Sequence, residues 1–234
     1  LLLGLVGELL SGILPRWRAL ADAGRCELAV SPYSHPILPL LLDFGSARES
    51  EPHALLPHAP QYPGGAARAA WHLEEAVRCF ERVFGRRPQG CWPSEGAISN
   101  AAVEAIEVAG FEWLATGSGV LRGSLEVSGE ALATDQALQD VQLNRARTLP
   151  GGTLRCFFRH EELSDKIGFT YSRWHGDDAA RNFVGEIEAL EERTRGAPVA
   201  AAAARSITPS PVMSPTAMFT PPRNPGSNTG RLTI

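Results

Sequence analysis

The chain has 234 residues, of which 44% are hydrophobic, and its formal net charge of −4 comes from 22 basic and 26 acidic residues. This length and apolar content suit one α/β domain with a sizeable core, or one domain followed by a tail. The charge is nearly balanced and no basic block stands out, so nucleic acid is excluded as an expected partner.

The opening segment "LLLGLVGELLSGIL" is apolar, but it is too short to cross a bilayer, carries Glu8 and lacks a basic leader. We interpret it as the start of an amphipathic core helix over 5–23 and expect no membrane association. No CxxC pair occurs among the cysteines, which favours reduced thiols in a cytoplasmic protein over a zinc site or a disulfide framework. These cysteines are Cys26, Cys79, Cys91 and Cys156.

Strand and helix patterns then alternate along the chain. The sequence predicts strands over 26–33, 89–92, 111–117 and 152–159. It predicts helices over 66–85, 100–109 and 176–194, of which the first has the most regular apolar spacing. Because repeated βα units place the carboxyl ends of parallel strands at one edge, this order predicts a parallel sheet or barrel with one common site.

The composition changes after the last predicted helix. Five alanines at 200–204 lead into a stretch rich in Pro, Ser and Thr that contains no acidic residue. Such a segment cannot bury enough apolar surface to order itself. We therefore predict a folded domain over 1–195 and a disordered, low-complexity tail over 196–234.

Titratable side chains follow three of the predicted strands: His35 in "SPYSHP", Glu95 in "WPSEG" and Asp165 in "FFRHEELSDKIGFTYSRW". Two carboxylates among aromatic rings are typical of glycosidases, in which one attacks the anomeric carbon and the other protonates the leaving oxygen. Aromatic faces also pack against the apolar faces of sugar rings. The candidate rings are Trp92, Trp113, Tyr171 and Trp174.

Each of these residues also has an ordinary structural interpretation. Glu95 suits a solvated acid near a helix N-terminus, and Asp165 suits a helix cap or a loop position. His35 suits a buried, hydrogen-bonded loop histidine, and Trp92 and Trp174 suit core positions. The residue types alone leave both interpretations open.

Three blocks, "SPYSHPILPLL", "GCWPSEGAIS" and "FFRHEELSDKIGFTYSRW", resemble the motifs of glycoside hydrolase family 57, the α-amylase and amylopullulanase-like group. They occur in the family's order, and the resemblance extends over roughly residues 5–195. It implies an incomplete (β/α)₇ barrel that acts on α-glucans with retention of anomeric configuration. The expected fold class is therefore α/β, a partial (β/α)₇-type barrel.

The resemblance also implies roles for individual residues. It makes Glu95 the nucleophile, Asp165 the general acid/base and His35 a sugar contact. The remaining expected substrate-binding residues are Trp92, Arg159, Tyr171 and Trp174. It implies no metal or cofactor, and the expected partner is an α-glucan polysaccharide or oligosaccharide.

Three departures from the family pattern bear on activity. The chain lacks the opening His-Gln-Pro motif, carries His160 where relatives often place Asp, and has the Pro/Ser/Thr tail in place of the last motif. We therefore expect a fragment whose open barrel leaves unpaired edges and exposed apolar surface. The alternative function is a truncated, catalytically inactive family member that binds at most glucan.

A metal-dependent polysaccharide deacetylase is a second alternative. That chemistry needs an Asp pair and two histidines at ligand spacing. The chain offers His53 and His58, five residues apart, and the adjacent pair Asp177 and Asp178. This spacing departs from the His-x-x-x-His pattern, so the sequence favours the glycosidase.

Overall fold

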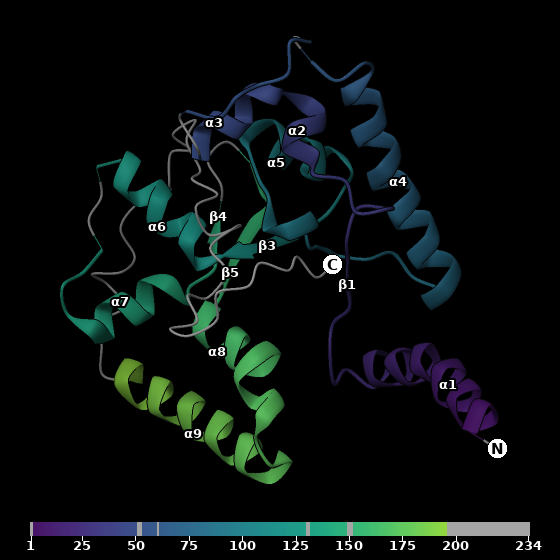
Figure 1. Ribbon diagram of the computed structural model, residues 1–234, viewed down its shortest axis with the longest axis vertical. Helices are drawn as coiled ribbons and strands as arrows, with labels where there is room; N and C mark the ends of the chain where they lie inside the picture. Colours follow the sequence, from purple (N-terminus) through teal and green to yellow (C-terminus); the bar gives the residue numbers. More distant parts are fainter. Residues whose placement is uncertain (1, 51–52, 60, 130–131, 149–151, 196–234) are drawn as a thin grey trace.

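A computed structural model describes residues 2–50, 53–59, 61–129, 132–148 and 152–195 of the protein. One sheet with the strand order β1-β2-β3-β5-β4 runs through it (Figure 1). The predicted parallel arrangement is confirmed, because β1 pairs with β2, β2 with β3 and β3 with β5 in parallel, while β4 joins β5 in antiparallel pairing. The strands are β1 (Ala29–Val30), β2 (Gly90–Cys91), β3 (Trp113–Gly117), β4 (Arg147–Thr148) and β5 (Arg155–Arg159).

The α/β fold class is confirmed, and the sheet is open, with β1 and β4 at its two edges. Helices surround it and connect its strands (Figure 1). They are α1 (Leu2–Asp22), α2 (Leu38–Leu42), α3 (Ala47–Ser50), α4 (Gly65–Phe84), α5 (Asn100–Val108), α6 (Ser118–Val127), α7 (Gln136–Leu143), α8 (Glu161–Asp165) and α9 (Gly176–Arg195). Helix α3 lies in 46–64, which the sequence pattern predicts as loop. Helices α6 and α7 and the short β4 lie in 118–150, which it predicts as irregular or helical in pieces.

The main core lies where α2, α4 and α5 cover the sheet. Leu38 of α2, Leu73 of α4 and Ile106 of α5 are buried together against Leu114 of β3. A smaller cluster joins α6 and α7 through Leu121, Leu125 and Leu143. Burial of these side chains fixes the parallel strands, and so also the loops that follow them.

Helix α4 forms as its apolar spacing predicts. The residues of its apolar stripe are buried except for the last, Phe84, which is half-buried; the buried ones are Ala69, Leu73, Ala76, Val77 and Phe80. Gly85 ends the helix in the left-handed conformation, and its amide donates a hydrogen bond to the carbonyl of Glu81.

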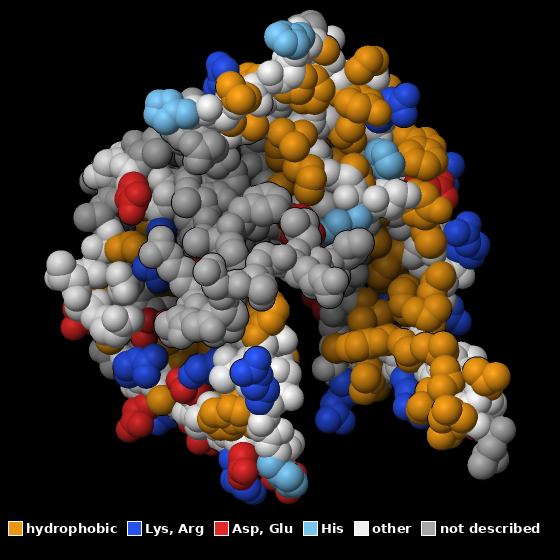
Figure 2. Space-filling view, in the orientation of Figure 1, with side chains coloured by type: hydrophobic (Ala, Val, Ile, Leu, Met, Phe, Trp, Pro, Cys, Tyr) orange, Lys and Arg blue, Asp and Glu red, His pale blue; other side chains and the backbone are white. Residues whose placement is uncertain are grey.

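Helix α1 is present, but the prediction that it is a core helix is wrong for the described part of the chain. Ala21 is its one buried residue, and its large apolar side chains are exposed. Hydrophobic atoms accordingly gather over this helix in Figure 2. The physical reason is that α1 is held to the rest of the described chain near its carboxyl end, where Arg18 donates to the carbonyl of Val83 and Asp22 pairs with Arg86. Among the described helices, none has the length and hydropathy needed to span a bilayer.

The four cysteines are free thiols. Cys91 on β2 and Cys156 on β5 are buried, and burial raises the pKa of each thiol from 9.0 to about 12. Both thiols therefore stay protonated at neutral pH.

The predicted tail, 196–234, lies outside the described residues, so the division into a domain and a tail stays a prediction.

Candidate active site

The loop after β2 presents Glu95. The amide of Trp92 donates to the carbonyl of Val30 at 2.9 Å, so this loop starts in register with β1. A helical turn then spans Ser94–Gly96, and the Thr116 hydroxyl of β3 donates to the carbonyl of Gly96 at 2.6 Å. These bonds tie the Glu95 loop to the strands on both sides of β2.

Backbone strain is concentrated at the same place. Among the described residues, the non-glycine positions with positive φ are Ser34 at 60°, His35 at 58° and Glu95 at 57°. Such conformations cost of order 1–3 kcal/mol each and persist only where surrounding structure enforces them. All three residues follow a parallel strand at its carboxyl end, which is where βα proteins place their functional groups.

The His35 ring nitrogen Nε2 lies 3.1 Å from Glu95 Oε1, and the two side chains are 52% and 58% exposed. His35 is therefore not the buried loop histidine of the structural alternative. The described contact of the Glu95 carboxylate is with His35, whereas helix α5 is capped by Ser99, which accepts from the amide of Ala102. Glu95 does not cap α5, and its exposure agrees with the solvated acid near a helix N-terminus that the residue types also allowed; that interpretation did not predict the contact with His35.

A hollow of about 280 Å³ opens around this pair. Its lining comes from the loops after β1 and β2, the end of β3 and the end of β5, so it lies at the carboxyl edge of the sheet. The lining residues are His35, Trp92, Glu95, Gly96, Gly117, Val120, Arg159 and Glu161. The structure therefore brings together four of the predicted site residues: His35, Trp92, Glu95 and Arg159.

Glu161 is a lining residue that the sequence reasoning missed. Its Oε1 accepts a hydrogen bond from the backbone amide of Gly119 at 3.1 Å. The available signal was its place in the third block, two residues after Arg159 and directly after the strand end. The Leu-Ser-Asp motif of the same block points instead to Asp165, at the far end of α8.

The other three predicted residues lie outside the lining of this hollow. Asp165 is exposed at the carboxyl end of α8. The Tyr171 hydroxyl donates to Asn182 of α9 at 2.7 Å, and the Tyr171 ring meets Trp174 edge-on at 5.3 Å between centroids. An ion pair between Lys166 and Glu186 also joins this segment to α9. The functional roles of Asp165, Tyr171 and Trp174 stay predictions.

Trp113 lies at the opposite end of β3 from the hollow. Its indole nitrogen donates to Glu27 at 2.6 Å, and its ring packs edge-on against Phe157. A side chain on Gly90 would meet that ring at 2.0 Å, so glycine is required there. The sequence grouped Trp113 with the sugar-binding rings because it identified the strand but not which end the ring occupies.

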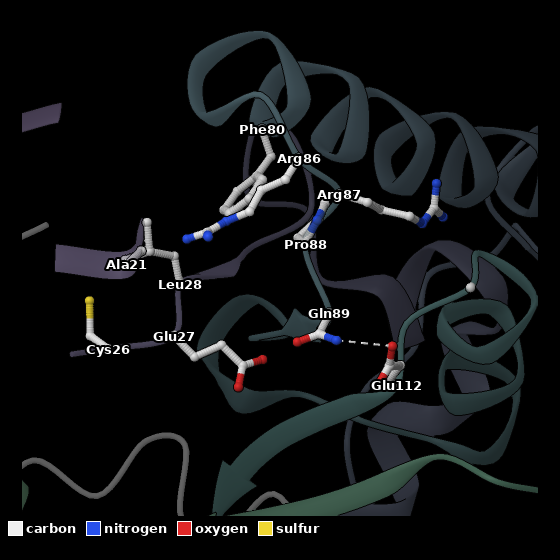
Figure 3. A pocket seen from close by; sticks show the side chains of 11 residues that line it. Ala21, Cys26, Glu27, Leu28, Phe80, Arg86, Arg87, Pro88, Gln89 and Glu112 are labelled. Atoms are coloured by element: carbon white, nitrogen blue, oxygen red, sulfur yellow. Dashed lines mark hydrogen bonds between the residues drawn. The ribbon is translucent and has the colours of Figure 1, made fainter. Parts of the chain in front are cut away.

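A larger hollow of about 490 Å³ lies at the amino ends of the strands (Figure 3). Several of its polar side chains already have hydrogen-bond partners. Gln89 donates to Glu112 at 3.1 Å, and Arg87 donates to the carbonyl of Ala109. It lies away from the strained loops, so the smaller hollow is the candidate active site.

Among the described residues, no group of three or more His, Cys, Asp or Glu side chains could hold a metal ion.

The tie between the Glu95 loop and β3 gives a testable prediction. Thr116→Val keeps the shape of the side chain but leaves the buried Gly96 carbonyl without this donor, so we expect a loss of about 1–3 kcal/mol in the free energy of unfolding. Ser94→Ala is the control, because the Ser94 hydroxyl is buried without a hydrogen-bond partner among the described residues. Urea denaturation of both variants checks this, and equal losses would contradict it.

The fold and the hollow define an α/β protein in which loops with titratable side chains lie together at the carboxyl edge of a parallel sheet. Residues 7–203 match the family described as glycosyl hydrolase family 57, and the chain belongs to that family. The resemblance seen in the three sequence blocks is thereby confirmed. No curated protein matches the chain.

Three solved structures are similar to the chain. The α-amylase AmyC from Thermotoga maritima is 15% identical, with a TM-score of 0.45, and the match covers 66% of this chain and 24% of that one. A GH57-type branching enzyme from Pyrococcus horikoshii is 19% identical, with a TM-score of 0.42 and coverages of 67% and 25%. A GH57 branching enzyme from Thermococcus kodakaraensis, solved with glucose, is 16% identical, with a TM-score of 0.43 and coverages of 68% and 28%. The chain thus spans about a quarter of the length of each.

Proposed function

We propose that the protein is a retaining glycoside hydrolase or transglycosylase that acts on α-glucans of the starch or glycogen type. The observation that carries this proposal is Glu95. It stands in the family's Trp-Pro-Ser-Glu block, has a strained backbone, and is hydrogen-bonded to His35 in an open hollow at the carboxyl edge of the sheet. A half-exposed carboxylate held in this way can reach the anomeric carbon of a bound sugar.

The proposed reaction has two displacements. Glu95 attacks the anomeric carbon, the bond to the leaving oxygen breaks, and a second carboxyl group donates its proton to that oxygen. Water, or a sugar hydroxyl in transglycosylation, then attacks the same carbon, and the second group takes the proton as Glu95 is released. The family motif assigns the acid/base role to Asp165, which stays a prediction.

The remaining lining residues suit sugar binding. Arg159 offers hydrogen-bond donors to hydroxyl groups, and the half-buried ring of Trp92 offers an apolar face. We propose α-glucan as the partner of this hollow. The four free thiols support our prediction of a cytoplasmic location.

A family member without catalytic activity that binds at most glucan is the second candidate. The observation that favours it is His160, which stands where relatives often place Asp. Its ring nitrogen Nδ1 accepts from the amide of Leu163 at 3.3 Å, so it caps α8 instead of facing Glu95.

Assays with maltoheptaose and with α-maltosyl fluoride separate the two candidates. The fluoride leaves without protonation, so fluoride release reports the nucleophile by itself. We expect fluoride release and an α-configured first product by proton NMR. Binding of maltoheptaose in calorimetry, without release of fluoride, would support the non-catalytic candidate and contradict the enzyme.

A further inference from the structure

We propose that Glu161, in place of Asp165, supplies the carboxyl group that works opposite Glu95 as the acid/base. This inference rests on the proposed function. Glu95 and Glu161 are the two carboxylates among the residues that line the hollow. They come from different strands, since Glu95 follows β2 and Glu161 follows β5.

The surroundings of Glu161 hold its carboxyl group in place. Oε1 accepts from the amide of Gly119 in the first turn of α6, where unpaired backbone amides favour an acceptor. A Cβ atom on Gly117 would lie 2.7 Å from the same oxygen, so the carboxyl group packs close against the backbone at the end of β3. Both contacts join the start of α8 to the segment where β3 ends and α6 begins, and the Glu161 side chain is half-buried.

Asp165 lacks these features in the described structure. It is exposed, stands one helical turn beyond Glu161, and is absent from the lining of the hollow. The next residue, Lys166, pairs with Glu186 of α9, which fixes this end of α8 against α9.

The chemistry of Glu161 follows from these contacts. With Oε1 accepting from Gly119, Oε2 is the oxygen that carries the proton in the acid form. That proton passes to the glycosidic oxygen as the bond to the anomeric carbon breaks and the bond to Glu95 forms. The resulting carboxylate then takes a proton from the attacking water, and Glu95 leaves with the electron pair of its ester bond.

The test compares Glu161→Gln with Asp165→Asn in the full chain, with Glu162→Gln as a control on the exposed side of α8. The probes are maltoheptaose, α-maltosyl fluoride and sodium azide. We expect Glu161→Gln to lower maltoheptaose turnover by about 10²–10⁴-fold, the usual contribution of acid–base catalysis. With the fluoride it should accumulate a maltosyl ester on Glu95, seen by intact mass, and azide should release this ester as α-maltosyl azide.

Glu162→Gln should turn over both substrates as the wild type does, and Asp165→Asn should accumulate no maltosyl ester. Glu161→Asp, which keeps the acid but shortens the side chain, should fall between wild type and Glu161→Gln, and this controls for a folding defect. Ester accumulation in Asp165→Asn, or normal turnover by Glu161→Gln, would overturn this inference and leave the proposed function standing. Absence of fluoride release and of ester from every variant, wild type included, would refute the proposed function and this inference together.

Discussion

Glu95→Gln is expected to lower hydrolysis of an α-1,4-glucan at least about 10³-fold, because the amide cannot form the glycosyl ester on which double displacement depends. The substitution keeps the size of the side chain and a group that can hydrogen-bond to His35. Glucan binding is therefore expected to survive, and kcat should fall while the dissociation constant of maltoheptaose stays close to the wild-type value. Initial rates and calorimetry on the same preparation measure the two effects.

The matched control is Glu104→Gln, which makes the same chemical change on the exposed face of α5. It should leave both turnover and binding unchanged, since Glu104 stands apart from the hollow. Near-normal turnover by Glu95→Gln, with contaminating wild-type enzyme excluded, would show that another group is the nucleophile.

The parallel sheet could be predicted from the sequence because each strand is bounded by clear helix signals. Helix α4 has an uninterrupted apolar stripe, and Ser99 and Gly110 bracket α5. Once the strands are known to be parallel, the loops with His35 and Glu95 and the end of β5 at Arg159 must share one edge, and the structure places all three residues there. The predicted topology therefore suffices to bring most of the candidate-site residues together.

The third block shows where such reasoning stops. After the end of β5, its residues belong to a helical segment that starts at Glu161, where one position along the chain turns a side chain by about 100° around the axis. A motif gives the order of Glu161 and Asp165 but not which of them faces β2. That depends on the contact of α8 with Gly117 and Gly119 and on the packing of its far end against α9, both of which are tertiary contacts.

Helix α1 shows that a correctly predicted helix can still be placed wrongly relative to the core. Its apolar residues predict a helix correctly, but hydrophobicity alone does not say which surface covers it. Two leucines, one in each of the long helices α4 and α1, allow the difference in burial to be measured. Leu73 of α4 is 1% exposed and belongs to the main core, whereas Leu9 of α1 is 51% exposed.

Leu73→Ala is expected to lower the free energy of unfolding by about 2–5 kcal/mol, because it removes buried methyl groups and leaves a cavity between α4 and the sheet. Leu9→Ala makes the same change in a helix interior, where Leu and Ala have similar propensities, so we expect a change within about 0.5 kcal/mol. Urea denaturation followed by circular dichroism measures both variants. A loss for Leu9→Ala as large as that for Leu73→Ala would mean that α1 is packed against another surface in solution, since an exposed leucine has no such burial to lose.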